Sequence, residues 1–301
     1  MFSTAHWSRI THTALLLVAI PAYSSASIVV SQDFTGNPAN PFDSIATNLS
    51  TTPPFSVAGD AFTIDFTPAE TTSGSPGTGQ STALINQTAP GGDVGLAFPD
   101  GDFILAVDVN PTTFTNTGGL ISLRAFENND AFLNFGVGLG VQTGFGASGD
   151  DATLQFFVGN SALPSPGPTE AAVFQHSTGG NETAYRLTLI GDFDDDVTPL
   201  NGDLVLTGIF TPDAAQNPNG LPEITISTTI DQATLGTLGL NFGARTFFGI
   251  QQSGSTNNDM NITYDNFLLA NTADLASVIP EPASLGLLTL GMLCLVSRRR
   301  V

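Results

Sequence analysis

The stretch AYRLTLI, residues 184–190, shows how this chain folds. Tyr185, Leu187 and Leu189 alternate with Arg186 and Thr188. In an extended backbone, successive side chains point to opposite faces, so such alternation places the apolar residues on one face and the polar residues on the other. The stretch therefore predicts a β-strand with one face in a core.

Ten further short runs, apolar or alternating and bounded by turn-forming residues, recur along the chain. They are SIVVSQDF (27–34), AFTIDF (61–66), FILAVDV (103–109), LISLRAF (120–126), AFLNFGVGL (131–139), ATLQFFV (152–158), DLVLTGIF (203–210), EITISTTI (223–230), RTFFGIQ (245–251) and NITYDNFLLA (261–270). No stretch shows a convincing helical period. The sequence therefore predicts an all-β fold, an antiparallel β-sandwich or jelly roll.

We expect residues 27–270 to form one such domain, because no long linker interrupts them. Residues 68–82 and 160–170 are rich in Gly, Pro, Ser and Thr and are expected to be surface loops, although either could divide two smaller sandwiches. Residues 271–279 are expected to form a short tether to the C-terminal tail.

The N-terminal 26 residues have the pattern of an export signal. Arg9 precedes an apolar stretch over residues 14–22, and the small residues Ser24 and Ala26 follow it. A weakly basic start, an apolar centre and small residues before the cut are typical of a secretory signal peptide, here cleaved near Ala26.

The last 24 residues, VIPEPASLGLLTLGMLCLVSRRRV (278–301), have three parts in a fixed order. Pro280, Glu281 and Pro282 come first, the apolar run 283–296 follows, and an arginine cluster ends the tail with Arg298, Arg299 and Arg300. The apolar run has 14 residues, fewer than the roughly 20 that span a bilayer comfortably, so its flanks would have to help it cross as a single helix. Because basic clusters beside apolar segments stay in the cytoplasm, the body is expected on the outer side.

This tripartite tail resembles the PEP-CTERM sorting signal of exported proteins in Gram-negative bacteria. The resemblance covers only the tail, and it implies recognition and processing near the Pro-Glu-Pro element by an exosortase, a membrane protease-transpeptidase. It also implies a protein that is held by the membrane before processing and then reaches the cell surface or an extracellular matrix. An ordinary tail anchor is the alternative, and it leaves Pro280, Glu281 and Pro282 unexplained.

The body's composition excludes several functions. Residues 27–279 keep three arginines and no lysine against 26 of the 27 acidic residues, a net charge of −23. Such a surface repels phosphate backbones, so we expect no nucleic acid partner. The body has a single histidine, His176, and its chain's only cysteine, Cys294, lies in the tail. Cysteine-based, lysine-based and histidine-rich zinc chemistry is therefore absent, and we expect a protein without enzymatic activity.

The densest acidic cluster, GDFDDDVTPLNGD, is a candidate binding site for a cation. Its Asp192, Asp194, Asp196 and Asp203 fall at positions 1, 3, 5 and 12 of an EF-hand-like window, and calcium is the ion that such oxygen ligands would bind. Position 6 is Val197 in place of glycine, and both flanks read as strands, which disfavours an EF-hand. Either this is an acidic hairpin loop in solvent, or it is a calcium loop of another geometry.

The two ends of the body also resemble, loosely, the first and last strands of concanavalin-like and laminin-G-like jelly rolls. VVSQDFTGNP near the start and NITYDNFLLA near the end carry the likeness, which implies that the terminal strands lie in one sheet. Asp33 would then approach Asp265. A second acidic group, completed by Asn257, Asn258, Asp259 and Asn266, could bind calcium there, but strand-end Asp and Asn more often satisfy turn backbones.

These observations favour a structural or interaction protein at the cell surface or in an extracellular matrix. The alternative is a calcium-dependent carbohydrate-binding module whose partner is an extracellular polysaccharide. A two-carboxylate glycoside hydrolase is disfavoured, because the body's five glutamates form no E-x-D-x-x-E pattern.

Overall fold

The structure, a computed structural model, describes fifteen segments of the chain. They are residues 27–36, 42–45, 55–66, 78–85, 88–89, 92–93, 102–114, 119–126, 136–145, 151–158, 172–175, 183–193, 202–238, 247–255 and 260–271. The signal-peptide region and the C-terminal tail lie outside these segments.

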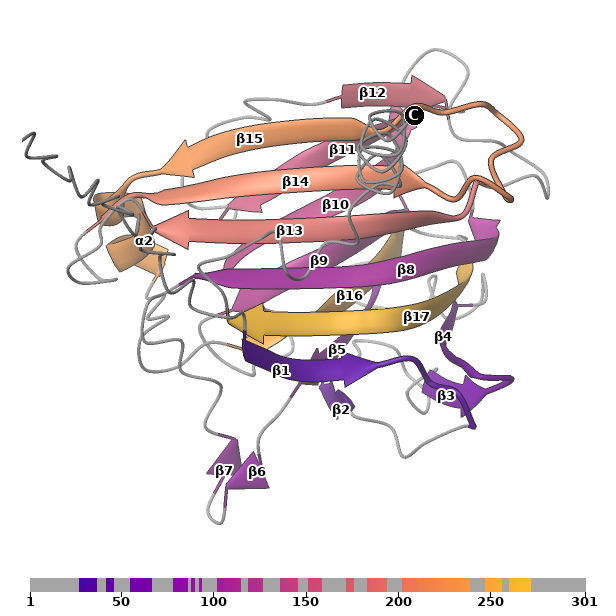
Figure 1. The fold of residues 1–301 in the computed structure, drawn as a ribbon, viewed down its shortest axis with the longest axis horizontal. Coiled ribbons are helices and arrows are strands. Elements are labelled where there is room, and N and C mark those ends of the chain that lie inside the picture. The colour runs from indigo at the N-terminus through magenta and orange to yellow at the C-terminus, as the bar shows by residue number, and fades with distance from the viewer. Residues whose placement is uncertain are drawn as a thin grey trace, which may run out of the picture.

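Two large antiparallel sheets form a sandwich (Figure 1). Sheet A, nearer the viewer in Figure 1, has the order β15 (Ile224–Ile230), β14 (Leu204–Pro212), β13 (Tyr185–Phe193), β8 (Phe103–Phe114), β17 (Met260–Asn271), β4 (Ala61–Phe66) and β3 (Phe55–Ala58), and β1 (Ser27–Gln32) also pairs with β17. Sheet B, behind it, has the order β12 (Ala172–Gln175), β11 (Asp151–Val158), β10 (Gly136–Phe145), β9 (Leu120–Phe126), β16 (Phe247–Ser255), β5 (Thr78–Ile85) and β2 (Phe42–Ile45).

Two small elements complete the described chain. A two-stranded hairpin is formed by β6 (Thr88–Ala89) and β7 (Gly92–Asp93), and a short helix, α2 (Gln232–Leu238), follows β15. The described chain is therefore nearly all β, as the alternation predicts.

The alternating residues fill the space between the sheets. Tyr185, Leu187 and Leu189 are at most 2% exposed and belong to the core, whereas Arg186 on the other face is partly exposed. Thr188 differs from the simple pattern, because it is buried although it lies on the outer face. Aromatic side chains from the two sheets contact each other in this core: the ring centroids of Phe103 on β8 and Phe248 on β16 are 5.1 Å apart.

All eleven predicted runs overlap strands of the structure. Two expectations were wrong. The region 68–82 is not wholly loop, because β5 begins at Thr78 and pairs with β16 through eight consecutive residues. A helix also exists: α2 buries Leu235 and Leu238, and Asp231 accepts a hydrogen bond from the Thr234 amide at 2.7 Å, as an N-cap does. Residues 160–170 lie outside the described residues.

The terminal strands share sheet A, as the loose jelly-roll likeness implies. β1 pairs antiparallel with the C-terminal half of β17, from Ser27 opposite Asn271 to Gln32 opposite Phe267. β4 pairs with the N-terminal half of the same strand edge, from Met260 opposite Phe66 to Tyr264 opposite Phe62. The chain leaving β1 and the turn before β4 therefore come together beside the middle of β17.

Candidate functional site

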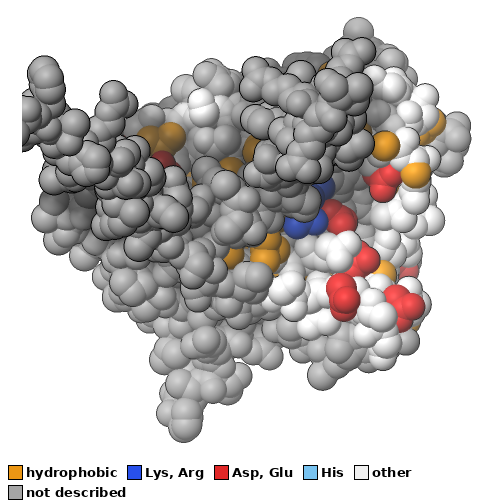
Figure 2. All heavy atoms as spheres, in the orientation of Figure 1, with side chains coloured by type: hydrophobic (Ala, Val, Ile, Leu, Met, Phe, Trp, Pro, Cys, Tyr) orange, Lys and Arg blue, Asp and Glu red, His pale blue; other side chains and the backbone are white. Residues whose placement is uncertain are grey.

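A polar hollow of about 560 Å³ opens on the outer face of sheet A. Its floor is formed by the middle of β17, the adjoining part of β8 and the start of β13, and its rims are the β3–β4 turn and the segment after β14. In Figure 2, which keeps the orientation of Figure 1, blue arginine atoms lie next to red carboxylates on this face.

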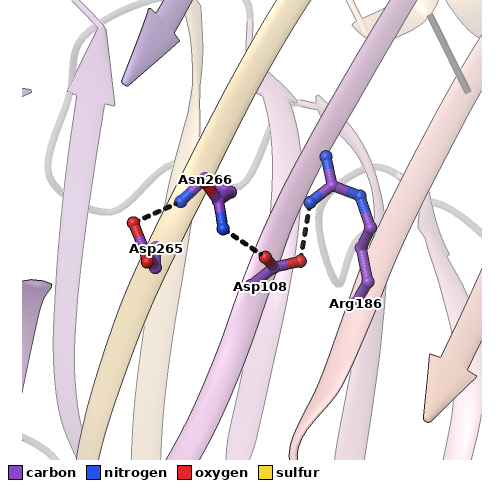
Figure 3. Close-up of polar contacts among 4 residues, drawn as sticks. All are labelled: Asp108, Arg186, Asp265 and Asn266. Atoms are coloured by element: carbon purple, nitrogen blue, oxygen red, sulfur yellow. Dashed lines mark hydrogen bonds and ion pairs between the residues drawn. The ribbon is translucent and has the colours of Figure 1, made fainter. Parts of the chain in front are cut away.

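Strand register builds the floor of the hollow. Asp108 of β8 lies opposite Arg186 of β13 on one side and opposite Asp265 of β17 on the other. Opposed residues on one face of a sheet have neighbouring side chains, so a row of three charged groups crosses the three strands. Arg186 Nη1 and Asp108 Oδ1 are 2.6 Å apart, an ion pair drawn in Figure 3.

A β-bulge directs a fourth side chain into this row. The register of β17 against β8 shifts between Asp265 and Leu268, and Asn266 takes a left-handed conformation with φ of 47°. Asn266 Nδ2 thereby donates to Asp108 Oδ2 at 2.7 Å, while its amide donates to Asp265 Oδ1 at 2.7 Å (Figure 3). Both carboxylate oxygens of Asp108 are thus engaged, and its side chain is fixed in the floor.

One rim is the tight hairpin turn between β3 and β4. Gly59 and Asp60 both have positive φ, 62° and 61°, which is the geometry of a two-residue type I′ turn. Asp60 Oδ1 accepts a hydrogen bond from the Gly36 amide at 2.7 Å, so the turn is tied to the segment that follows β1. In that segment Asp33 Oδ1 accepts from the Thr35 amide at 3.1 Å.

The opposite rim is a compact turn after β14. The Asp213 amide donates to the Ala184 carbonyl at 2.8 Å, and the Ala184 amide donates to the Gln216 carbonyl at 3.0 Å. Asp213 Oδ1 accepts from the Ala215 amide at 2.6 Å. These bonds hold the Gln216 side of the hollow against the start of β13.

The charge in the hollow is predominantly negative. Burial first, and then the carboxylates of Asp108, Asp33 and Asp60, raise the pKa of Asp265 above its usual value, although the bond from the Asn266 amide opposes this. Within the described segments, however, no three His, Cys, Asp or Glu side chains are grouped so that they could hold a metal ion. The hollow offers amide, hydroxyl and guanidinium donors beside carboxylate acceptors, which suits the binding of a polar ligand.

Half of the predicted calcium loop can be placed. β13 and β14 pair antiparallel, with Asp192 opposite Val205 and Phe193 opposite Leu204, so residues 194–203 connect two strands of a hairpin. Asp192 and Asp203 are exposed, and Asp203 Oδ1 accepts from the Gln232 amide at 3.0 Å, close to the start of α2. Asp194 and Asp196 lie outside the described residues.

The other predicted residues have mixed outcomes. Asp33 does approach Asp265, as the pairing of the terminal strands requires. Residues 256–259, the histidine at 176 and the whole tail with Pro280, Glu281, Pro282, Arg298, Arg299 and Arg300 lie outside the described residues. Among the described residues, no helix has the length and apolar character to cross a bilayer.

Sequence reasoning missed Asp108 and the partnership with Arg186. One signal was present, because Asp108 interrupts the apolar run FILAVDV at an outward position. Its partner could not be identified, since the alignment of β8 with β13 and β17 depends on contacts between segments about 80 and 160 residues apart along the chain.

Comparison with known proteins identifies the tail and the fold. A family model for the PEP-CTERM protein-sorting motif matches residues 278–300. No curated protein matches the chain. Among solved structures, a Bauhinia forficata lectin in complex with GalNAc is similar with a TM-score of 0.50 and 12% identity, covering 81% of this chain and 98% of the lectin.

Two further solved structures are similar at lower TM-scores. A seed lectin from Lotus tetragonolobus has a TM-score of 0.47 at 12% identity, covering 81% of this chain and 99% of the lectin. The catalytic domain of an endo-1,3-β-glucanase (laminarinase) from Thermotoga petrophila has a TM-score of 0.45 at 10% identity, covering 83% of this chain and 99% of that domain. At such identities the likeness concerns the jelly-roll fold alone.

Proposed function

We propose that this chain, which ends in a PEP-CTERM sorting motif, is an exported β-sandwich protein with a structural or interaction role at the cell surface or in an extracellular matrix. The motif at residues 278–300 is the observation that carries the proposal. An N-terminal signal peptide, residues 1–26, starts export; the tail, residues 280–301, holds the protein in the membrane until an exosortase-type protease processes it. The sandwich of residues 27–270 is the part that is delivered.

The delivered sandwich interacts through the hollow on sheet A. Its volume of about 560 Å³ falls within the usual range for small-ligand sites, roughly 300–1,000 Å³. Asn110, Gln216 and Thr263 line it together with the Arg186–Asp108 ion pair, so a hydroxyl-rich ligand would find donors and acceptors on three strands and on the turn after β14. A saccharide unit of an extracellular polysaccharide has this chemistry. The lectin in complex with GalNAc supports the idea only through a shared fold.

Calcium dependence is the alternative form of this proposal. The described residues do not fit a calcium site by themselves, because they contain no suitable group of three acids and Asp203 already accepts the Gln232 amide. A calcium loop would therefore depend on Asp194 and Asp196 together with Asp192. Calorimetric titration of the full-length protein with calcium tests it, and the absence of heat removes the calcium-dependent form.

Localisation tests the sorting part. Cells that express the full chain are compared with cells that express a chain lacking residues 280–301, and membrane, surface and culture fractions are probed with an antibody. We expect the truncated chain to bypass the membrane and to appear in a different fraction. Unchanged distribution would contradict sorting by the tail.

Binding tests the interaction part. A glycan array is probed with the full-length protein with and without calcium, and hits are quantified for Asn110→Ala and Gln216→Ala. We expect each variant to lose about tenfold in affinity, the effect of about 1.4 kcal/mol of lost hydrogen bonding. Thr225→Ala on β15 is the matched control, because Thr225 is exposed outside the hollow. The absence of any glycan signal, or equal loss in the control, would remove the hollow as the site.

A further inference from the structure

Arg124 is a buried cation on the opposite side of the sandwich from the hollow. It lies on β9, where its neighbours Leu123 and Ala125 face the core, so its own side chain belongs to the outer face of sheet B. The residue is only 8% exposed. Its Nε donates to Ser122 Oγ at 3.2 Å, and its guanidinium carbon lies 4.5 Å from the centre of the Phe157 ring on β11.

A glycine strand makes this arrangement possible. Gly138 of β10 lies between Arg124 on β9 and Phe157 on β11 in the strand register. A Cβ on Gly138 would collide with Arg124 Cδ and would lie 2.6 Å from the Leu123 carbonyl oxygen. At Gly140 a Cβ would lie 2.9 Å from Phe157 Cε2. Because Gly138 and Gly140 have no side chains, the Arg124 side chain can extend over β10 and contact the Phe157 ring.

Among the residues that the structure describes, no carboxylate forms an ion pair with Arg124. Within the described segments the ion pair of Arg186 with Asp108 stands alone, and it belongs to sheet A. The polar side chains that the structure describes on this face carry no charge: Ser122, Gln142, Thr153, Gln155, Gln251 and Ser253. Strand register also puts two acidic residues at positions of this face, Asp43 three strands away from Arg124 and Asp151 six residues before Phe157 on β11. In a chain of net charge −20, the described side chains beside Arg124 on this face are therefore uncharged.

An uncompensated buried charge is energetically costly, and an anion would offset the cost. Burial lowers the pKa of Arg124 to about 10, so the guanidinium is still charged at neutral pH. The face of the guanidinium lies over Phe157, and Nε donates to Ser122 Oγ. Among the described residues, no hydrogen bond uses Nη1 or Nη2, the pair of donors whose geometry matches an oxyanion.

We propose that Arg124, positioned by Ser122, Gly138 and Phe157, is the centre of a second binding site, which takes a single oxyanion such as a carboxylate or a sulfate ester. Because Arg124 is only 8% exposed, it offers no open surface on which a flat sugar face could stack. Two sources have this chemistry: an acidic sugar of a surface polysaccharide, and a free small anion. The site shares no residue with the hollow of sheet A, so the failure of one proposal would leave the other untouched.

The test compares charged and neutral probes on the full-length protein. Tri-galacturonate, the neutral galactotriose, acetate and sulfate are titrated calorimetrically. For Arg124→Gln we expect the affinity for the anionic probes to fall by at least about tenfold, the effect expected for a lost charge-assisted pair. Galactotriose binding should not change. Thr225→Ala on β15, an exposed position outside the hollow, is the control and should leave anion affinity within about twofold.

The outcomes separate the two sources. Arg124-dependent binding of tri-galacturonate that exceeds acetate binding supports the acidic-sugar source, and Arg124-dependent binding of acetate or sulfate alone supports the free-anion source. Both support the site. Anion binding that is absent, or equal in wild type and Arg124→Gln, would overturn it and leave Arg124 a structural residue.

A measurement on the unaltered protein keeps the test valid if the variant does not fold. In protein labelled with ¹⁵N-arginine, the Hε signal of Arg124 should stand upfield of the other arginines, because the guanidinium lies over the Phe157 ring. Anion addition should shift this signal in a saturable way. A signal that does not respond to any of the anionic probes would contradict the site.

Discussion

At the scale of single residues, two tyrosines in the core have opposite hydrogen-bonding states. The Tyr264 hydroxyl donates to Gln252 Oε1 at 2.9 Å, and Gln252 Nε2 donates to the Met260 carbonyl at 3.1 Å. The Tyr185 hydroxyl is buried without a hydrogen-bond partner in the part of the chain that the structure describes. Burial raises the pKa of both groups, so both are neutral phenols.

Because only one of the two hydroxyls has a partner among the described residues, replacing each tyrosine by phenylalanine should change the free energy of unfolding differently. Tyr264→Phe should lower the free energy of unfolding by about 1–3 kcal/mol, because the buried Gln252 oxygen loses its donor. Tyr185→Phe should be neutral or stabilising by up to about 1 kcal/mol, because it removes a buried hydroxyl that has no partner. Urea denaturation measures both. Equal destabilisation by the two substitutions would contradict the assignment.

The raised pKa of Asp265 gives a pH-dependent prediction. Its folded-state pKa lies above the ordinary value of an aspartate, so the folded state favours the protonated carboxyl, and this contribution to stability is lost as pH rises through the folded pKa. Asp265→Asn keeps an acceptor for the Asn266 amide and removes the repulsion from Asp108, Asp33 and Asp60.

The Asp265→Asn protein should therefore be more stable than wild type at neutral pH and should lose this advantage near about pH 3, where both side chains are uncharged. Thermal unfolding across this pH range measures the difference. An advantage that persists unchanged at low pH would show that charge is not its cause.

At the scale of elements, two glycines have opposite surroundings, one between the sheets and one in the helix. Gly208 lies on β14, and a Cβ there would collide with Leu139 of β10 and would lie 3.2 Å from Phe156 Cε1 of β11. Gly236 lies in α2, and a Cβ there meets no atom within 4 Å. The same substitution should therefore have opposite effects at the two positions.

Gly208→Ala should destabilise the protein by about 1–3 kcal/mol, because it overpacks the space between the sheets. Gly236→Ala should stabilise it by up to about 1 kcal/mol, because alanine favours a helix and nothing obstructs it. Denaturant unfolding measures the change in the free energy of unfolding for both variants. A destabilised Gly236→Ala protein would contradict the prediction for α2.

Element prediction from the sequence succeeded where periodicity was strong. The runs around β13 and β14 alternate cleanly, and β14 shows alternating burial from Leu204 to Phe210. It failed for β5, whose residues TGQSTALI are Gly- and Thr-rich and resemble loop, because pairing with β16 overrides weak local preference. It also missed α2, although Asp231 as N-cap and the spacing of Leu235 and Leu238 were available signals.

At the scale of the whole molecule, β17, the last of the described strands, pairs with β1, the first of them. It pairs with β8 along one edge and with β4 and β1 along the other, so sheet A is completed only when the last strand is in place. The ladder ends at Asn271, before the matched sorting motif begins at residue 278.

Two truncations test this arrangement. A chain lacking residues 272–301 should keep the cooperative unfolding of the full-length protein, because all described strands remain. A chain lacking residues 260–301 should fail to fold, because removing β17 exposes the edges of β8, β4 and β1 and uncovers core residues such as Ile262 and Tyr264. Circular dichroism and thermal unfolding compare them, and a folded protein without residues 260–301 would contradict the central role of β17.

The sequence by itself determined the strand-rich fold and the sorting tail, because both depend on local patterns: alternation within a few residues, and three tail features in a fixed order. Only the tertiary structure decided that Asp108 meets Arg186 and Asp265, and that Arg124 has Phe157 in place of an acid. The physical reason is strand register. It aligns residues far apart in the chain, and a shift of one residue would turn every side chain to the other face.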